Sequence, residues 1–336
     1  MTPQQAYAFV ESQAKHIERK VYRKRYASIQ YRGLVPIDTS ASDWAKGITY
    51  YSADAVGSAD FLAGRANDFP LVNFNMAKNN TVIDMLGLGY DWSLEEISTA
   101  RMTGNLQPLV EKASMVRRIA EEKIDDLWFN GYSPLGWHSM AKPALVRRTL
   151  SPNNGTGNSR NWKDKTAELI LKDINTLLQG VFYGDPEQAN DTGSETVEFA
   201  DTLLLSPNLI APLNEKVIAN TAVTAIEFIK KNNVYTMRTG RALKIGWMRG
   251  LETAGSDVAA TSAANQVATT TAGNPVGRVI AYRRDPEVLK LHMPMPLRFL
   301  PTWQKGPMTW VRGAIFRLGG LEIRLPGAMR VLDAVE

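Results

Sequence analysis

The sequence predicts an α+β protein, and three stretches of the chain carry that prediction. The first is one long amphipathic helix over residues 106–130, and the second is an extended, charge-poor region over residues 28–92. The third is the part after residue 164, where short helices and short strands alternate. With 336 residues, of which 44% are hydrophobic and 22% charged, the chain is long enough for one large domain or two.

The long helix is predicted from apolar residues that recur at steps of three and four. Pro108 falls in its first turn, where a missing N–H costs nothing, and Asn130-Gly131 ends it with residues that tolerate the left-handed conformation. A helix of this length is a rod of about 35 Å, along which we expect other elements to pack. The apolar stripe is Leu109, Ala113, Val116, Ala120, Ile124 and Leu127, and the opposite face carries Arg117, Arg118, Glu121, Glu122, Lys123 and Asp125.

The N-terminal segment is predicted to be a basic helix that starts with Thr2 as its N-cap and Pro3 at the first position. One interpretation is a solvated helix face, as is usual for a run of charges. A second is an arm that lies against a phosphate backbone, and a third, a membrane-surface helix, would need bulkier apolar residues than alanine. The basic residues are Lys15, Arg19, Lys20, Arg23, Lys24 and Arg25.

Residues 28–92 are predicted to be mostly extended, with strands at residues 47–52 and 81–86, where β-branched and aromatic residues gather. The segment between these strands holds scattered apolar residues that are too few to form a core of their own. A compact domain seldom contains an irregular segment of this length unless it packs on a partner. We therefore expect residues 45–90 to form a long two-stranded arm that docks on another subunit. The candidate contact residues are Phe61, Leu62, Phe69, Leu71, Val72 and Phe74.

The remainder of the chain is predicted from caps, turns and apolar runs. Ser93 and Glu96 form a capping box that opens a short helix to Thr103. Helices are expected at 164–180, after Ser206, and at 222–231 before a stop at 232–233, and residues 251–273 are expected to be a surface loop. The predicted strands are 202–205, 241–248, 278–282, 308–318 and 321–325, the last two joined by a hairpin turn at Gly319-Gly320 with Leu321, Ile323 and Leu325 on one face and Glu322 and Arg324 on the other.

The motifs of several enzyme classes are missing from the sequence. The chain has no cysteine, which excludes disulfides, cysteine-ligated zinc and thiol nucleophiles, and its three histidines lack metal-ligand spacing. It has no phosphate-binding loop, no dinucleotide fingerprint, no nucleophile elbow, and no apolar run that could span a membrane. The neighbouring carboxylates at 121–122 and 125–126 are expected to be solvated charges. No catalytic residue, metal or cofactor is therefore expected.

The order of the elements, together with several short stretches, resembles the major capsid proteins of tailed bacteriophages with the Hong Kong 97-like fold, which encapsulin shells share. A basic arm, a long extended loop, a spine-like helix, an α/β region and returning strands follow one another in that order. The resemblance runs from about residue 45 to the end, and within it the chain is most similar to an uncharacterised major-capsid-type branch. The matching stretches are DTLLLSP at 201–207, IEFIKKNN at 226–233, YRRDPE at 282–287, LHMPMP at 291–296 and RLGGLEIRLP at 317–326.

This resemblance implies a division of the chain into an N-terminal arm (1–44), an extended loop or E-loop (45–92), a peripheral P-domain with the spine helix (93–150 and 278–336) and an axial A-domain (151–277). It also implies a structural subunit that is not an enzyme. Such a subunit self-assembles into pentamers and hexamers of an icosahedral virion shell in the bacterial host cytoplasm and makes non-specific contacts with packaged double-stranded DNA. Scaffolding, portal and decoration proteins are further candidate partners, and the segment before residue 45 is expected to be too short for a scaffolding domain. The alternatives are an encapsulin-like compartment for a protein cargo and, from another class, an α/β enzyme with an unrecognised site.

Overall fold

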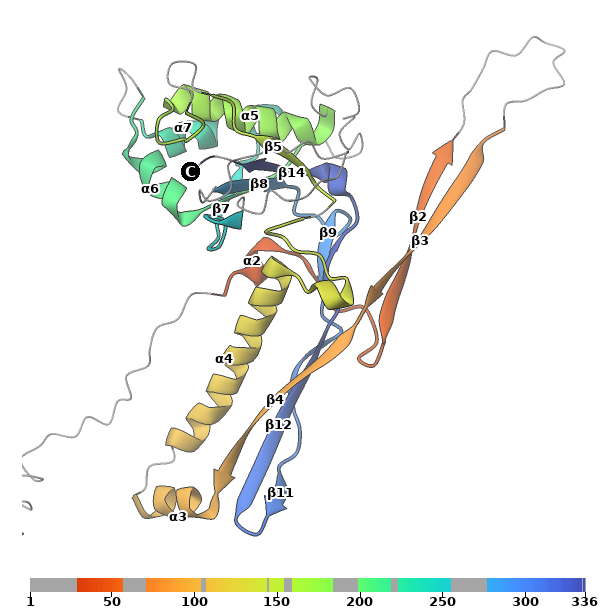
Figure 1. Ribbon diagram of the computed structural model, residues 1–336, viewed down its shortest axis with the longest axis vertical. Helices are drawn as coiled ribbons and strands as arrows, with labels where there is room; N and C mark the ends of the chain where they lie inside the picture. The colour runs from red at the N-terminus through yellow and green to blue at the C-terminus, as the bar shows by residue number, and fades with distance from the viewer. Residues whose placement is uncertain are drawn as a thin grey trace, which may run out of the picture.

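The computed structural model describes residues 29–56, 71–103, 107–143, 145–153, 159–183, 199–218, 223–254, 277–333 and 335. The predicted basic helix at the N-terminus and most of the predicted surface loop at 251–273 lie outside these residues. Three parts stand out in Figure 1: a rounded body built on a sheet, a long helix with strands that runs away from it, and a slender two-stranded arm that projects to one side.

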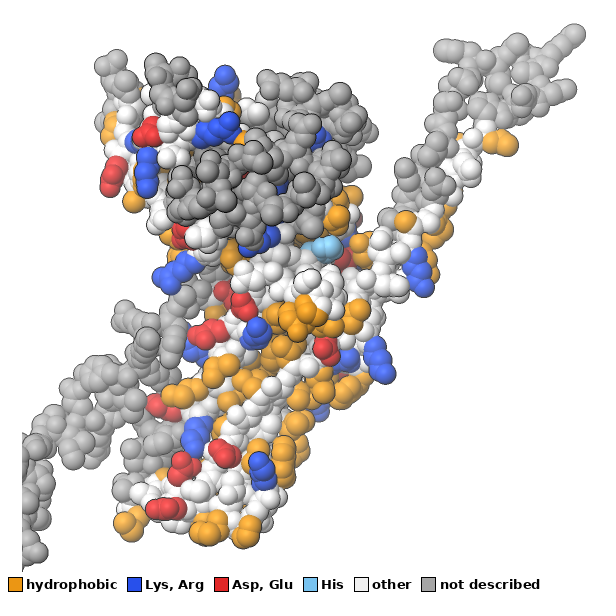
Figure 2. Space-filling view, in the orientation of Figure 1, with side chains coloured by type: hydrophobic (Ala, Val, Ile, Leu, Met, Phe, Trp, Pro, Cys, Tyr) orange, Lys and Arg blue, Asp and Glu red, His pale blue; other side chains and the backbone are white. Residues whose placement is uncertain are grey.

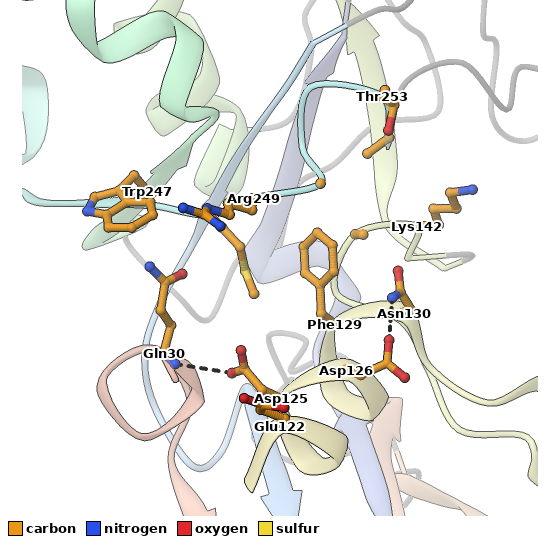
Figure 3. A pocket seen from close by; sticks show the side chains of 14 residues that line it. Gln30, Glu122, Asp125, Asp126, Phe129, Asn130, Lys142, Trp247, Arg249 and Thr253 are labelled. Carbon is orange, nitrogen blue, oxygen red and sulfur yellow. Dashed lines mark hydrogen bonds between the residues drawn. The ribbon is translucent and has the colours of Figure 1, made fainter. Parts of the chain in front are cut away.

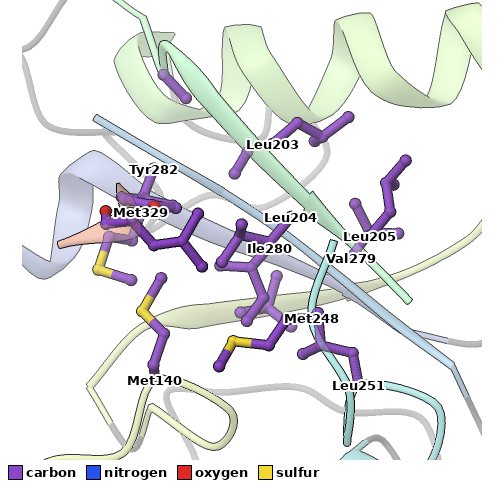
Figure 4. Packing of buried hydrophobic residues seen from close by; sticks show 14 of the residues in the cluster. Met140, Leu203, Leu204, Leu205, Met248, Leu251, Val279, Ile280, Tyr282 and Met329 are labelled. Carbon is purple, nitrogen blue, oxygen red and sulfur yellow. Dashed lines mark hydrogen bonds between the residues drawn. The ribbon is translucent and has the colours of Figure 1, made fainter. Parts of the chain in front are cut away.

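The body is organised around a mixed five-stranded sheet in the order β5-β14-β8-β6-β7. Its central strands β6 and β8 are buried along their whole length, as expected for the predicted apolar runs, and Figure 4 shows their side chains packed with Met140, Met248 and Met329. The strands are β5 Arg147–Leu150, β6 Thr202–Leu205, β7 Lys244–Trp247, β8 Arg278–Tyr282 and β14 Met329–Asp333. The helices of this body are α5 Ala167–Tyr183, α6 Pro207–Glu215, α7 Ala225–Asn232 and α8 Val234–Thr239.

The predicted long helix is confirmed as α4 (Gln107–Asn130), which we call the spine helix. Its end is the predicted one, since Gly131 follows with φ of 70°. The C-terminal part of the apolar stripe (Val116, Ala120, Ile124 and Leu127) is buried. A short 3-10 turn, η1 (Ser133–Leu135), then leads back toward the body.

A second sheet, the lower sheet, runs beside the spine helix. It has four strands in the order β10-β12-β11, with β4 paired along the whole of β12. The predicted capping box is confirmed at the start of α3 (Leu94–Thr103): Ser93 Oγ accepts from Glu96 N, Glu96 Oε2 accepts from Ser93 N, and both distances are 3.2 Å. The strands are β4 Asp84–Ser93, β10 Met295–Phe299, β11 Trp303–Gly306 and β12 Thr309–Leu318.

The predicted two-stranded arm is present as the hairpin of β2 (Gly47–Val56) and β3 (Asn73–Val82), which we call the hairpin arm. Its register runs from Gly47 opposite Val82 to Val56 opposite Asn73. The predicted single strand at 81–86 is wrong, because the chain bends at the buried Ile83 and continues as β4 in the lower sheet. The hairpin arm is therefore shorter than predicted.

A third sheet of three strands, β1 (Ile37–Asp38), β9 (Leu289–His292) and β13 (Gly320–Ile323), lies between the body and the lower sheet. The predicted hairpin at Gly319-Gly320 is wrong, because β12 pairs with β4, β10 and β11 whereas β13 pairs with β9. Gly320 has φ of 69°, and a Cβ there would lie 2.3 Å from Trp137 Cγ. The chain therefore needs glycine at this position, where it crosses from the lower sheet to the third sheet in close contact with Trp137.

Two short helices were not predicted. The region 28–92 begins with α2 (Tyr31–Leu34), although extended chain was expected there. The second is α8, which begins directly after the helix end predicted at Asn232-Asn233. The Asn233 side chain accepts a hydrogen bond of 2.8 Å from Thr236 N and so caps α8. A 3-10 turn, η3 (Pro326–Ala328), precedes the last strand.

Candidate assembly surfaces

The hairpin arm has two faces with different surroundings. Residues directly opposite each other in an antiparallel pair share a face, which places Tyr51, Phe74, Met76 and Val82 together on one of them. All four of these side chains are exposed. We call this group of four apolar residues the outer arm face; Lys78, opposite Tyr51, lies on the same side of the arm, and no element of the described chain covers it.

Three of the six predicted contact residues lie within the described chain. Leu71, Val72 and Phe74 are 88%, 71% and 59% exposed, an unusual condition for large apolar side chains that sit so close together. Figure 2 shows hydrophobic side chains along the arm and over the lower part of the molecule. Phe61, Leu62 and Phe69 lie outside the described residues, as do Lys15, Arg19, Lys20, Arg23, Lys24 and Arg25 of the basic segment.

The base of the hairpin arm is fixed by backbone and aromatic contacts to the segment after the spine helix and to the residue after β13. Trp137 Nε1 donates a hydrogen bond of 2.8 Å to Val82 O, and Ile83 N donates one of 3.0 Å to Lys46 O. The Arg324 guanidinium lies 4.9 Å from the centre of the Tyr50 ring, which is on the other face of the arm. The arm is thus anchored at its root, while its outer face stays exposed.

Beside this root lies a buried cluster of charges that spans β1, β9 and β13. His292 Nε2 contacts Glu322, Lys290 Nζ contacts Asp38, and Arg324 Nε lies 2.7 Å from Glu322 Oε1. Burial works against ionisation of both carboxyls. The hydrogen bonds from Lys290 and Ser40 nevertheless lower the pKa of Asp38, and those from His292 and Arg324 lower the pKa of Glu322. Glu322 alternates with Leu321 and Ile323 along β13, as a strand requires, and the side chains on both faces of this strand are buried.

The carboxylates of the spine helix were expected to be solvated, and for two of them this is wrong. Glu121 accepts hydrogen bonds of 2.6 Å from the Tyr31 hydroxyl and from Arg32 Nη2. Asp125 Oδ1 accepts from the backbone N–H groups of Gln30 and Tyr31, at 3.2 and 3.0 Å. Desolvation and the bond to Glu121 raise the pKa of Tyr31 to about 12.

The segment that contains α2 also touches the body, so that it joins two parts of the molecule. The Tyr282 hydroxyl donates 2.8 Å to Leu34 O, and Lys244 Nζ donates 2.6 Å to Gly33 O. Residues 30–34 therefore link the spine helix on one side to strands β7 and β8 on the other. No sequence signal pointed to this role, because it depends on partners more than 80 residues away.

A cavity of about 420 Å³ lies between the end of the spine helix and the segment that follows β7. Phe129 forms part of its wall, and Gln30, Trp247 and Arg249 lie across from the helix (Figure 3). Its carboxylates have partners: Glu122 pairs with Arg118 at 2.8 Å, and Asp126 accepts 2.7 Å from Asn130. Among the described residues, no group of three or more acidic, histidine or cysteine side chains is arranged to hold a metal ion.

The comparisons with known proteins agree with this architecture. A family model described as "Major capsid protein" matches residues 57–335. The chain belongs to the major capsid protein family. No curated protein matches the chain. Within the described residues, no helix is both long and apolar enough to cross a membrane.

Solved phage capsids share the fold of this major capsid protein. The capsid of the Myoviridae phage XM1 aligns with a TM-score of 0.69 at 13% identity, covering 96% of this chain and 98% of that chain. The protein from Mycobacterium phage Bobi aligns with a TM-score of 0.56 at 10% identity, covering 97% of each chain. The capsid of a native GTA particle aligns with a TM-score of 0.54 at 8% identity, covering 96% and 95%. The α+β capsid fold is thereby confirmed, and the family match confirms the prediction of a structural subunit of a phage capsid.

Proposed function

We propose that copies of this chain assemble as pentamers and hexamers into an icosahedral shell in which each hairpin arm lies over a neighbouring subunit. The observation that carries this proposal is the exposure of Leu71, Val72 and Phe74 on an arm that projects from the body. Apolar surface of this kind gains free energy when a partner removes it from water, by about 25 cal/mol for each Å². In a capsid, every subunit is surrounded by further copies of the same chain, so a second copy is the partner that we propose.

The regions of the subunit follow from the same proposal. We assign residues 1–44 to an N-terminal arm, 45–92 to the extended loop, 93–150 and 278–336 to a peripheral domain, and 151–277 to an axial domain. The spine helix and the lower sheet support the peripheral assignment, because they form one elongated unit beside the arm. The separate five-stranded sheet with its helices supports the axial assignment.

We further propose that the shell encloses double-stranded DNA in a virion assembled in the cytoplasm of the bacterial host. The support is the sequence of the N-terminal segment, where six basic residues fall between positions 15 and 25. Contacts of this type neutralise phosphates without reading bases and weaken as salt rises. Scaffolding, portal or decoration proteins are further partners that such a shell accommodates.

The central test is deletion of residues 54–76 from the arm. We expect the subunit to stay folded, by circular dichroism, and to fail to form particles in size-exclusion chromatography and electron microscopy. A matched control is Met237→Asp, which places a charge on an exposed apolar residue of α8, a helix of the body. Normal particles from the deleted chain would refute the role of the arm.

The genome is tested separately from the shell. Particles from infected or induced cells are expected to contain nucleic acid that becomes nuclease-sensitive only after the shell is opened. Particles that contain a protein cargo and no nucleic acid would instead identify an encapsulin-like compartment.

A further inference from the structure

One buried arginine in the lower sheet lacks the partner that its charge requires. Arg317 lies on β12 between Met295 of β10 and Met85 of β4, and it is only 7% exposed. Its Nη1 donates 3.1 Å to the backbone oxygen of Asp43, and the Trp44 ring centre lies 5.9 Å from its guanidinium carbon. Its Nε has no hydrogen-bond partner, and no carboxylate of the described chain forms an ion pair with it.

Arg278 shows what a compensated arginine looks like in the same molecule. It is fully buried, and its guanidinium forms two hydrogen bonds with the carboxylate of Asp333, at 2.6 and 3.0 Å. A buried charge without an anion is costly unless it is paired and hydrogen-bonded. In the isolated subunit, the charge of Arg317 is therefore compensated less fully than the charge of Arg278.

The surroundings of Arg317 have the composition of an interface centre. Trp44, which covers the guanidinium, is 64% exposed, and Met85, the cross-strand neighbour of Arg317, is also exposed. Val82, which precedes Met85 by three residues in the chain, is exposed as well and belongs to the outer arm face. Aromatic residues, methionine and arginine are the types enriched where two protein surfaces bury each other, and arginine and tryptophan dominate binding energy there.

We propose that this patch, consisting of Trp44, Val82, Met85 and Arg317, docks a carboxylate-bearing segment of a second copy of this chain. The incoming carboxylate pairs with the Arg317 guanidinium, and the three apolar side chains surround the pair. Charge complementarity selects an acidic segment as the occupant. Val82, a residue of the outer arm face that lies three positions before Met85 in the chain, selects a second copy, so the inference rests on the proposed assembly function.

The first experiment compares Arg317→Met with Arg278→Met. Removal of the uncompensated charge at 317 is expected to leave the unfolding temperature of unassembled subunits unchanged or higher. The subunit concentration needed for particle formation, followed by light scattering, is expected to rise at least about tenfold. Arg278→Met should lower the unfolding temperature, because it leaves the buried carboxylate of Asp333 without its charged partner.

The outcomes separate this inference from the function on which it rests. If wild-type chains form particles and Arg317→Met chains form them at the same concentration, the docking site is refuted while the assembly function stands. If wild-type chains form no particles under any condition, the assembly function itself fails. Trp44→Ala, on an exposed side chain, repeats the measurement should Arg317→Met not fold, and unchanged assembly of that variant would likewise refute the docking site.

The second experiment identifies the incoming carboxylate. Particles of Arg317→Lys, built from a mixture of ¹⁵N-labelled and unlabelled chains, are treated with a carbodiimide, which joins an amine to a carboxylate in contact with it. We expect peptides that link Lys at 317 of one isotope to an Asp or Glu peptide of the other. Links only within one isotope, or none, would overturn the proposal.

Discussion

The hairpin arm and the five-stranded sheet are both made of extended chain, yet they are stabilised in different ways. Every residue of β6 and β8 is buried, whereas no residue of the arm whose burial the structure describes is buried. The sheet gains its stability from apolar surface removed from water within one subunit. The described part of the arm has its backbone ladder, a hydrogen bond from Thr49 Oγ1 to Asn80 Oδ1 and its anchored root, and a two-stranded hairpin alone is marginal in water.

This difference indicates whether the apolar side chains of each region stabilise the folded subunit or the assembled shell. In the body and along the spine helix, substitutions of apolar residues should act on folding. In the arm, they should act on assembly and leave folding almost unchanged. The predictions below test that division, and they run from the largest expected effect on subunit stability to the smallest.

Ile124→Asp on the spine helix should have the largest effect. Ile124 is 2% exposed, so the substitution places an unpaired charge in the core and should lower the free energy of unfolding by more than about 4 kcal/mol. Urea denaturation followed by circular dichroism measures it. The control is Ile119→Asp on the same helix, which is 55% exposed and should change stability by less than about 1 kcal/mol. Equal losses at both positions would mean that the buried face has been misassigned.

Asp38→Asn should cost about 1.5–3 kcal/mol at neutral pH, because it removes a charged partner of Lys290. The folded-state pKa of Asp38 is lowered, so its contribution is complete above the unfolded value of about 4 and is lost as the pH falls below it. The stability difference between wild type and variant should therefore shrink in acid, below about pH 4. Asp43→Asn, on an exposed side chain, is the control, and a difference independent of pH would contradict the ion pair.

Ser93→Ala should cost about 1 kcal/mol, since it removes the side-chain oxygen that caps α3. Thermal unfolding of the subunit measures the loss. Ser98→Ala, on an exposed position inside the same helix, should be neutral or slightly stabilising, because alanine favours helix. A loss at Ser98 equal to that at Ser93 would show that capping is not the cause.

Phe74→Asp on the outer arm face should change subunit stability by less than about 0.5 kcal/mol, because the side chain is exposed. The same substitution should abolish or strongly reduce particle formation. Urea denaturation and size-exclusion chromatography together give the two readings. A large loss of subunit stability would show that the arm folds back on its own subunit, and the contrast between arm and body would then disappear.

The sequence predicted those features that depend on neighbours in the chain. The spine helix and the capping box at Ser93 follow from spacings of three or four residues, the glycine stop follows from the Asn130-Gly131 pair, and all three are confirmed. The strand at 202–205 was predicted from a continuous apolar run, and it lies in the centre of the buried sheet. The exposed positions of Leu71, Val72 and Phe74 agree with apolar residues that have no core of their own to enter.

What the sequence by itself determined is thus the local period of each element and, through the order of those elements, the capsid family. Only the tertiary structure decided which charges are solvated and which are paired. Glu121 and Asp125 accept hydrogen bonds from Tyr31 of α2, and Glu322 contacts His292. Gly319-Gly320 connects strands of two different sheets, where a hairpin was expected. The physical reason is that a strand's partner and a carboxylate's partner are chosen by packing between segments far apart in the chain, which the periodicity of one segment does not encode.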